Sequence, residues 1–153
     1  MKKVIVLLVC CIFWVASFCF ASDLKKVDNP TVEMLQGKWE GKFERTSSKR
    51  FSGPFEMKFK GNKALVTRGA VGTDPITQWV VTIDKIEKGK IYMSNERSEF
   101  EIALFTNGKA ESFIEGNYSG RKAGALSRAN SDIKLQRVSK TVDDKDIPAD
   151  ANK

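Results

Sequence analysis

Histidine is absent from the 153 residues, and the three cysteines, Cys10, Cys11 and Cys19, all lie near the amino terminus. A serine or cysteine nucleophile that depends on a histidine base is therefore excluded, and imidazole ligation of a metal is excluded with it. These absences leave carboxylate chemistry and binding without chemistry as the classes to weigh.

The first 21 residues have the three parts of a secretory signal peptide. Lys2 and Lys3 precede the apolar run Val4–Phe20, and the segment closes on a small residue at Ala21. A short membrane anchor is the alternative, but no stop-transfer pattern follows the run. No small residue directly precedes a cysteine, which argues against lipid attachment. We therefore predict removal of residues 1–21 and export, either to a periplasm or to the medium.

The predicted mature chain is short, mildly basic and free of thiols. Removing 21 residues from 153 leaves 132, enough for one domain with its own core. Because no disulfide is available, its stability depends on burial. The leader takes two lysines with it, so 24 basic side chains face 19 acidic ones, a net charge of +5. This balance favours an anionic envelope surface as a neighbour and lacks the basic stripe of a nucleic-acid binder.

In the middle of the chain the hydrophobic period is two. Trp39 and Phe43 alternate with charged residues, and so do Phe55, Met57 and Phe59. This is the pattern of half-buried antiparallel strands. Eight strands are predicted in this way: Gly37–Glu44, Phe55–Lys60, Ala64–Arg68, Ile76–Ile86, Lys90–Asn95, Glu99–Phe105, Lys109–Tyr118 and Asp132–Val138.

Turn-forming residues separate these runs at a spacing of roughly ten residues. Asn107-Gly108, for example, predicts a type I′ turn between two alternating segments. The pattern predicts an all-β fold over residues 37–140, a single antiparallel up-and-down β-barrel of about eight strands, with a β-sandwich as the alternative. Residues 121–128 read either as a loop at the barrel mouth or as an extra short strand.

The two ends of the mature chain differ from the strand region. Residues 22–36 form an N-terminal segment with a short helix predicted over 29–36, because Asn29 can cap it, Pro30 suits its first position and Gly37 follows its end. Residues 141–153 are rich in aspartate and poor in large apolar side chains, which predicts a disordered acidic tail. The tail lacks the glycine and distal glutamate of an EF-hand loop, so no metal site is predicted.

A family resemblance rests on a short helix, a glycine–x–tryptophan at the start of the first strand, and an arginine on the last strand. The matching residues are Gly37, Trp39 and Arg137. Through them the chain resembles the lipocalin-type (calycin) barrel over residues 29–138. The resemblance implies that Trp39 plugs the closed end and that Arg137 lies over its indole. The alternative role for Trp39 is that of a large core residue in a β-sandwich.

Two sets of charged residues are candidates for chemistry or docking. Glu99, Glu101 and Glu115 would suit a hydrolase only if two of their carboxylates lay roughly 5 to 10 Å apart. Solvated outer positions explain them better, so no enzyme and no catalytic residue are predicted. The basic residues of the second and third strands form either a docking surface or cross-strand pairs with glutamates. These residues are Lys58, Lys60, Lys63 and Arg68, and the glutamates are Glu40, Glu44 and Glu56.

If the sheet closes, one set of large side chains points inward. It comprises Phe43, Phe55, Met57, Phe59, Trp79, Val81, Ile83, Phe100, Ile102 and Leu104. So many large residues favour a filled centre with a shallow pocket at the open end.

The sequence thus predicts a non-enzymatic protein, without cofactor, that binds an apolar or amphiphilic small molecule. The predicted pocket residues are Phe55, Phe59, Trp79 and Tyr118. The alternative is an envelope structural or interaction protein that docks on an anionic surface or on another protein. The oligomeric state is left open by these patterns.

Overall fold

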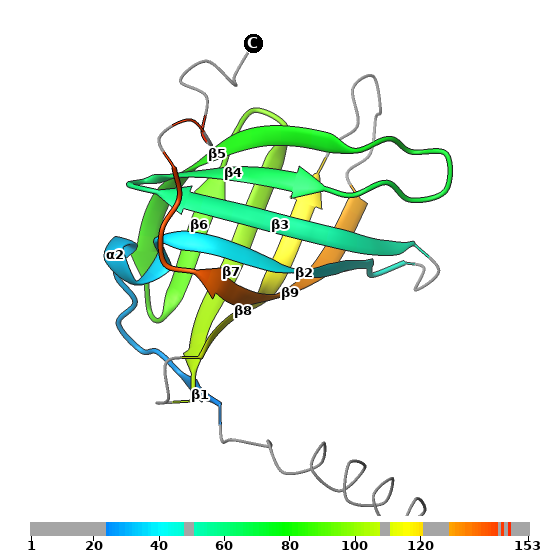
Figure 1. Ribbon diagram of the computed structural model, residues 1–153. Helices are drawn as coiled ribbons and strands as arrows, with labels where there is room; N and C mark the ends of the chain where they lie inside the picture. Colours follow the sequence, from blue (N-terminus) through cyan, green and yellow to red (C-terminus); the bar gives the residue numbers. More distant parts are fainter. Residues whose placement is uncertain are drawn as a thin grey trace, which may run out of the picture.

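The computed structural model describes residues 24–47, 51–107, 111–120 and 129–143, together with residues 145 and 147 (Figure 1). The predicted leader, the segment 121–128 and most of the predicted acidic tail lie outside these residues. Within the described part, no helix is long and apolar enough to cross a membrane.

An antiparallel barrel of eight strands, with one two-residue strand added, makes up the described part of the chain. The predicted all-β fold and single up-and-down barrel are confirmed, and the sandwich alternative is wrong. The strands are β1 (Lys25–Lys26), β2 (Gly37–Arg45), β3 (Ser52–Lys60), β4 (Lys63–Arg68), β5 (Thr77–Glu87), β6 (Lys90–Ser94), β7 (Ser98–Thr106), β8 (Ser112–Gly120) and β9 (Ala129–Ser139).

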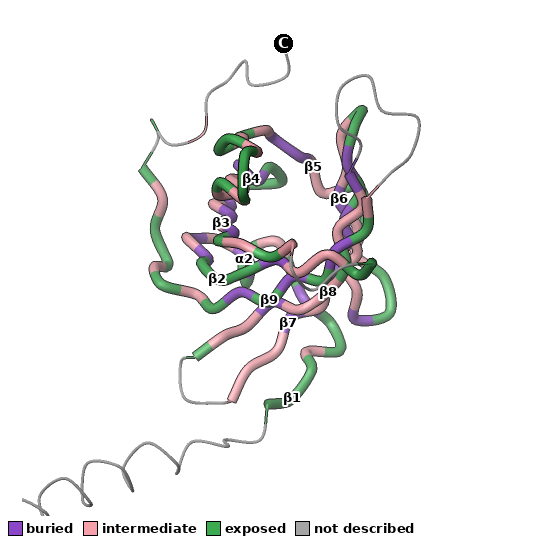
Figure 2. Tube along the Cα trace, turned by 90° about the vertical axis from the view of Figure 1, so that its right-hand side faces the viewer, coloured by how far each residue is buried: buried purple, intermediate pink, exposed green. Residues whose placement is uncertain are grey.

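The barrel closes because β2 pairs with both its successor β3 and the last strand β9. Every strand from β2 to β9 also pairs with the next one along the chain, so the sheet forms a ring (Figure 2). The closing register places Trp39 opposite Arg137 and Phe43 opposite Ile133. β1 adds to β7 at Phe105 and Thr106, beyond the residues of β7 that pair with the start of β6. Closure removes the free strand edges that an open sheet would present.

The interior is filled by the side chains that alternation assigned to it. Eight of the ten predicted inward residues are less than 5% exposed, whereas Trp79 and Ile83 are only partly buried. Ile83 lies beside a register shift between β5 and β6, where the regular alternation is interrupted. Trp79 lies toward the open end of the barrel, where part of its ring reaches the surface.

The turn between β7 and β8 differs from the prediction. Thr106 pairs with Ser112, so residues 107–111 form a five-residue connection and the predicted two-residue type I′ turn is wrong. The Asn107 amide donates to the Glu111 carbonyl at 3.4 Å, and the Thr106 hydroxyl donates to the same oxygen at 3.1 Å. Residues 108–110 themselves lie outside the described residues.

The predicted helix is present but shorter. It forms α2 (Val32–Leu35), and Thr31 rather than Asn29 is its N-cap. Thr31 has an extended backbone, which leaves Pro30 before the helix instead of at its first position. Leu35 is fully buried while Met34 is 43% exposed, so Leu35 is the residue that anchors α2 on the end of the barrel.

Candidate functional site

The end of the barrel next to α2 is sealed by Trp39. Its indole is fully buried and packs edge-on against Phe59, with 6.5 Å between the ring centroids. The indole N–H donates to the Leu35 carbonyl at 2.7 Å, which satisfies a carbonyl in the last turn of α2. Gln36 makes a second connection between the end of α2 and the barrel. Its side-chain nitrogen donates to the Gly61 carbonyl at 3.0 Å, and its side-chain oxygen accepts from the Gly61 amide at 2.8 Å.

Arg137 covers the outer side of this plug. Its guanidinium lies 4.6 Å from the centre of the Trp39 ring and donates to the Met34 carbonyl. Burial lowers the pKa of Arg137 from its ordinary value, but the group remains charged. A partly desolvated cation over an indole is stabilised by about 1–2 kcal/mol. Gly37, the first residue of β2, has a φ of +115°, a backbone conformation that favours glycine.

The opposite end of the barrel holds a continuous aromatic cluster. Tyr118 stacks on Phe100 at 4.8 Å between ring centroids, and it lies 5.8 Å from Trp79 and 5.9 Å from Phe55. Phe55 in turn lies 5.9 Å from Phe43. We call Phe43, Phe55, Trp79, Phe100 and Tyr118 the mouth cluster. Its Phe43, Phe55 and Phe100 rings are buried, whereas Trp79 and Tyr118 are partly exposed.

Three of the four predicted pocket residues, Phe55, Trp79 and Tyr118, therefore lie together. The fourth, Phe59, does not join them, because it packs on Trp39 at the closed end and is 1% exposed. Phe55 and Phe59 share the inward face of β3 but lie four residues apart, roughly 13 Å along a strand. Alternation assigns them to the same face without saying at which end of the barrel each lies.

Hydrogen-bond donors surround the mouth cluster. Arg68 is the last residue of β4 and lies on its inward face. Its guanidinium lies 5.9 Å from the centre of the Phe43 ring and forms an ion pair with Asp74 at 3.8 Å. Arg45 stacks on Phe51 at 4.4 Å. The sequence groups Arg68 with an outer basic surface, but Arg68 shares the inward face of β4 with Ala64 and Val66 and lies opposite Phe55.

Two buried N–H groups at the mouth lack a hydrogen-bond acceptor among the described residues: the Arg68 Nε and the Trp79 Nε1. Such an orphaned donor costs about 1–3 kcal/mol when it is cut off from water. Trp79 faces Val66 across the β4–β5 pair, and Arg68 is two residues further along β4. The two donors therefore come from neighbouring strands on the inner face.

Burial raises the pKa of the Tyr118 hydroxyl above its ordinary value, and the charges of Arg68 and Arg45 oppose this shift. The opposing effect of both arginines indicates that their positive charges reach the phenol. At neutral pH the hydroxyl is thus held neutral and remains a donor.

The raised pKa predicts that alkaline conditions destabilise the fold through Tyr118. The neutral phenol is favoured in the folded state, so its stabilising contribution is complete below the ordinary pKa of 10.0 and is lost as the pH rises through the higher folded value. Phenylalanine has no hydroxyl to ionise. As the pH rises from about 9 to about 11, we therefore expect the free energy of unfolding to fall less in Tyr118→Phe than in the wild type. Urea unfolding at a series of pH values tests this, and parallel curves would contradict it.

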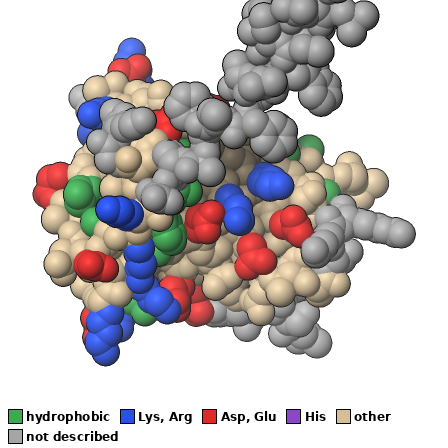
Figure 3. All heavy atoms as spheres, turned by 90° about the horizontal axis from the view of Figure 1, so that it is seen from below, with side chains coloured by type: hydrophobic (Ala, Val, Ile, Leu, Met, Phe, Trp, Pro, Cys, Tyr) green, Lys and Arg blue, Asp and Glu red, His purple; other side chains and the backbone are tan. Residues whose placement is uncertain are grey.

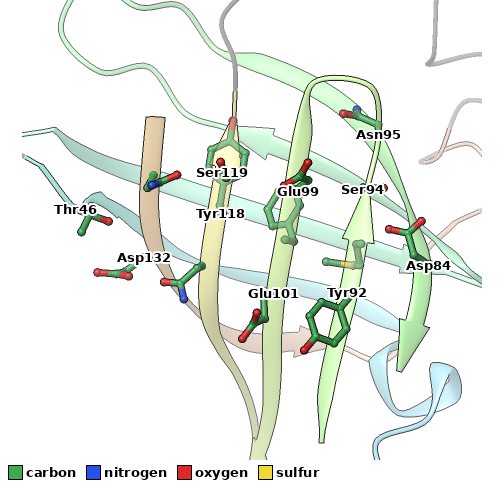
Figure 4. A pocket seen from close by; sticks show the side chains of 14 residues that line it. Thr46, Asp84, Tyr92, Ser94, Asn95, Glu99, Glu101, Tyr118, Ser119 and Asp132 are labelled. Atoms are coloured by element: carbon green, nitrogen blue, oxygen red, sulfur yellow. The ribbon is translucent and has the colours of Figure 1, made fainter. Parts of the chain in front are cut away.

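A concave feature lies on the outer wall, over β5 to β9. It is a groove of about 730 Å³ on the half of the wall nearer the mouth (Figure 4). Outward side chains line most of it, and they are carboxylates, amides, hydroxyls and the Tyr92 phenol, while Met93, Phe100 and Tyr118 also border it. Among them are Asp84, Tyr92, Glu99, Glu101, Asn117 and Asp132. We call this the outer groove, and sequence reasoning missed it because alternation marks outward residues without showing that the wall is hollowed.

Asn95 shapes one end of the outer groove. Its side-chain oxygen accepts from the Arg97 amide at 2.9 Å and from the Ser98 amide at 2.8 Å, and its amide nitrogen donates to the Val80 carbonyl at 2.9 Å. These bonds end β6 at Ser94, one residue before the predicted boundary. Asn95 therefore belongs to the turn and holds it against β5.

Acidic and basic side chains on the outer wall pair across strands. Lys38 bonds Glu56 at 3.0 Å, Lys134 bonds Glu115 at 3.3 Å, and Lys90 bonds Glu101. Figure 3 shows both signs side by side on the lower face of the barrel of Figure 1. Exposed pairs of this kind contribute little to stability, typically 0–1 kcal/mol.

The described residues hold no group of three or more acidic, histidine or cysteine side chains arranged to bind a metal ion. Glu115 is engaged by Lys134 and Glu101 by Lys90, which matches the reading of these carboxylates as outer surface charge. Comparison with known proteins finds no match for this chain among family models, curated proteins or solved structures.

Proposed function

We propose that this chain is an exported, non-enzymatic, lipocalin-like binding protein that takes an apolar or amphiphilic small molecule at the mouth of its barrel. The observation that carries the proposal is the mouth cluster, where two partly exposed rings, Trp79 and Tyr118, rest on three buried ones. Aromatic surface of this kind contributes strongly to binding when a ligand removes it from water.

The filled interior limits the size of such a ligand. Met57, Met93, Ile102 and Leu135 belong to the same core as the mouth cluster and are almost completely buried. A ligand would therefore lie in a shallow site across Trp79 and Tyr118, instead of running down the barrel axis. This favours a compact ring or a short chain over a long lipid.

The alternative of docking on an anionic surface through the lysines of β3 and β4 has less support. Lys58 lies 4.0 Å from Glu56, and Lys38 also pairs with Glu56. These contacts neutralise part of the region, and the outer groove adds four carboxylates to the wall over β5 to β9. A surface of mixed sign attracts an anionic membrane weakly.

The proposal predicts that a mouth residue and an outer-groove residue respond differently to substitution. We expect Tyr118→Ala to weaken binding of the neutral probe N-phenyl-1-naphthylamine by about tenfold, because it removes a central ring of the site. Trp79→Ala should weaken it as much, because Trp79 belongs to the mouth cluster and does not line the outer groove. Tyr92→Ala is the control, since Tyr92 lines the outer groove alone, whereas Tyr118 borders both. Probe fluorescence gives the affinities, and circular dichroism confirms that the three variants are folded.

If Tyr92→Ala weakens binding of the probe and Trp79→Ala does not, binding occurs at the outer groove and the proposed mouth site is wrong. Absence of binding by the wild type contradicts the proposed function as a whole. Native mass spectrometry of protein purified from its own envelope supplies an independent test, with a co-purified small molecule as the expected result.

A further inference from the structure

Two apolar residues are buried on the outer side of the barrel wall. Leu65 is 7% exposed and Val80 is 3% exposed, yet neither belongs to the core cluster that fills the interior. Their chain neighbours Ala64, Val66 and Val81 do belong to that cluster, so alternation directs this pair outward. The two residues are direct partners in the β4–β5 register, and we call them the outer patch. Their low exposure requires a cover on the outer side of the wall.

The chain that follows β9 crosses this wall. In Figures 1 and 2 it leaves the end of β9 and runs over the outer face of β2, β3 and β4, where Figure 1 draws it in red. The Ser139 hydroxyl accepts from the Thr141 amide at 3.1 Å and donates to the Thr141 carbonyl at 3.0 Å, which turns the chain out of the direction of β9. The segment starts close to β2, because a Cβ on Gly37 would lie 2.0 Å from the Ser139 carbonyl oxygen and 2.9 Å from the Lys140 Cα. We call its described residues, 140–143, 145 and 147, the strap.

The strap buries its apolar residues in preference to its polar ones. Val142 and Ile147 are partly buried, whereas Thr141, Asp143 and Lys145 are exposed. Burial of the two apolar side chains needs apolar surface beneath the strap, and the outer patch lies on the wall that the strap crosses. The strap therefore provides the cover that the outer patch requires.

The charges of this wall and of the segment that crosses it are complementary. Lys58 lies directly opposite Leu65, and Lys60 lies opposite Lys63, so three lysines flank the outer patch. The Lys58 side chain is only 19% exposed, although it lies on the outer face. Residues 141–150 contain four aspartates and one lysine. Complementary charge of this kind selects and orients the segment that docks.

We propose that the outer patch and its flanking lysines are a docking surface for an extended acidic segment of a partner protein, which carries two apolar anchors and displaces the strap. This inference goes beyond the proposed function, because it concerns the outer face of the wall and leaves the mouth unchanged. The strap shows the chemistry that fits the surface, since it is acidic and buries two apolar residues separated by four others.

The strap acts as a competitor attached to the same chain. A short attachment gives it an effective concentration on the order of millimolar, which a partner has to exceed. The glutamates that weaken attraction to a membrane do not prevent this docking, because the apolar anchors supply most of the affinity and the lysines supply selectivity.

Release of the strap tests the docking surface. The probe is a fluorescein-labelled peptide with the sequence of residues 140–153, and its binding is followed by fluorescence anisotropy. A double variant of the whole protein, Val142→Ser with Ile147→Ser, removes both anchors from the strap. We expect this released variant to bind the probe at least about tenfold more tightly than the wild type, in which the surface is already occupied. Added salt should weaken the binding.

Two control peptides separate the anchors from the charge. A peptide with serine in place of both anchors should bind the released variant at least about tenfold more weakly than the probe. A peptide with asparagine in place of the aspartates at 143, 144 and 146 should bind about threefold to tenfold more weakly.

Substitution on the wall locates the site. Leu65→Ser, added to the released variant, should weaken probe binding at least about tenfold. Val80→Ser is a second variant with the same expected effect, and it keeps the test valid if Leu65→Ser does not fold. Ile76→Ser is the matched control, because Ile76 is an apolar residue between β4 and β5 that is 65% exposed. It should leave probe binding unchanged, and circular dichroism reports the folding of each variant.

Each outcome supports or overturns the inference. Equal probe binding by the wild type and the released variant would show that the strap does not occupy the surface. Equal effects of Ile76→Ser and Leu65→Ser would place the probe elsewhere. If the released variant binds the wild-type chain as tightly as the free probe, the occupant is a second copy and the separate partner is wrong. Absence of probe binding by every variant overturns the docking surface, whereas the proposed mouth function is tested separately by N-phenyl-1-naphthylamine.

Discussion

Trp39→Ala should lower the free energy of unfolding by about 3–5 kcal/mol, the range for removing a large buried aromatic side chain. Trp39 is fully buried, packs on Phe59, and lies under the Arg137 guanidinium. The truncation leaves a cavity, takes the donor away from the Leu35 carbonyl, and removes the surface on which Arg137 stacks. Three kinds of contact are lost with one side chain, which is why this effect is expected to be among the largest.

Urea unfolding followed by circular dichroism measures this loss. Trp39→Phe is the matched control, because it keeps a ring against Phe59 but loses the N–H donor, and it should cost clearly less than Trp39→Ala. Hydrogen exchange of Leu35 and Gln36 should also quicken in Trp39→Ala, since α2 is tied to the barrel through the indole. A Trp39→Ala protein as stable as the wild type would show that the indole does not seal the barrel.

Gly41→Ala should destabilise the barrel by about 3 kcal/mol, because β2 and β9 approach too closely at this point for any side chain. A Cβ on Gly41 would lie 2.0 Å from the Lys134 carbonyl oxygen and 2.9 Å from the Leu135 Cα. Both are backbone atoms of the strand that closes the barrel. Gly41 and Leu135 are direct partners in that ladder, so neither can retreat without breaking the closing pairing.

The next residue supplies the control for this prediction. Lys42 is exposed on the same strand, and Lys42→Ala should change the free energy of unfolding by no more than about 0.5 kcal/mol. Urea midpoints compare the two variants, and hydrogen exchange should show faster opening of β2 and β9 in Gly41→Ala. Equal midpoints would mean that the closing strands can separate without cost.

Strand positions were predictable because burial of one face requires a period of two. Phe43, Phe55 and Phe100 are buried as alternation requires, and each predicted strand is present within a few residues of its expected bounds. Two of the boundaries that moved are at places where a side chain makes a local hydrogen bond. Asn95 ends β6 in this way, and the bonds of Thr106 and Asn107 to Glu111 lengthen the turn before β8.

The candidate site was predictable only in part. Phe55, Trp79 and Tyr118 meet at the mouth, but Phe59 belongs to the closed end, where it packs on Trp39 of the neighbouring strand β2. Arg68 had a sequence signal in its inward parity, yet its role depends on Trp79 and Tyr118, which come from other strands. The outer groove had no signal, because the curvature of a wall is a property of five strands together.

The sequence by itself determined which residues form strands and which face of each strand is apolar, because these depend on neighbours along the chain and on a fixed two-residue period. Only the tertiary structure decided that β2 pairs with β9, that Arg137 lies over Trp39, and that two unpaired N–H groups border one aromatic cluster. These features depend on the register and tilt with which distant strands close into a ring, and that geometry is selected by packing of the whole interior.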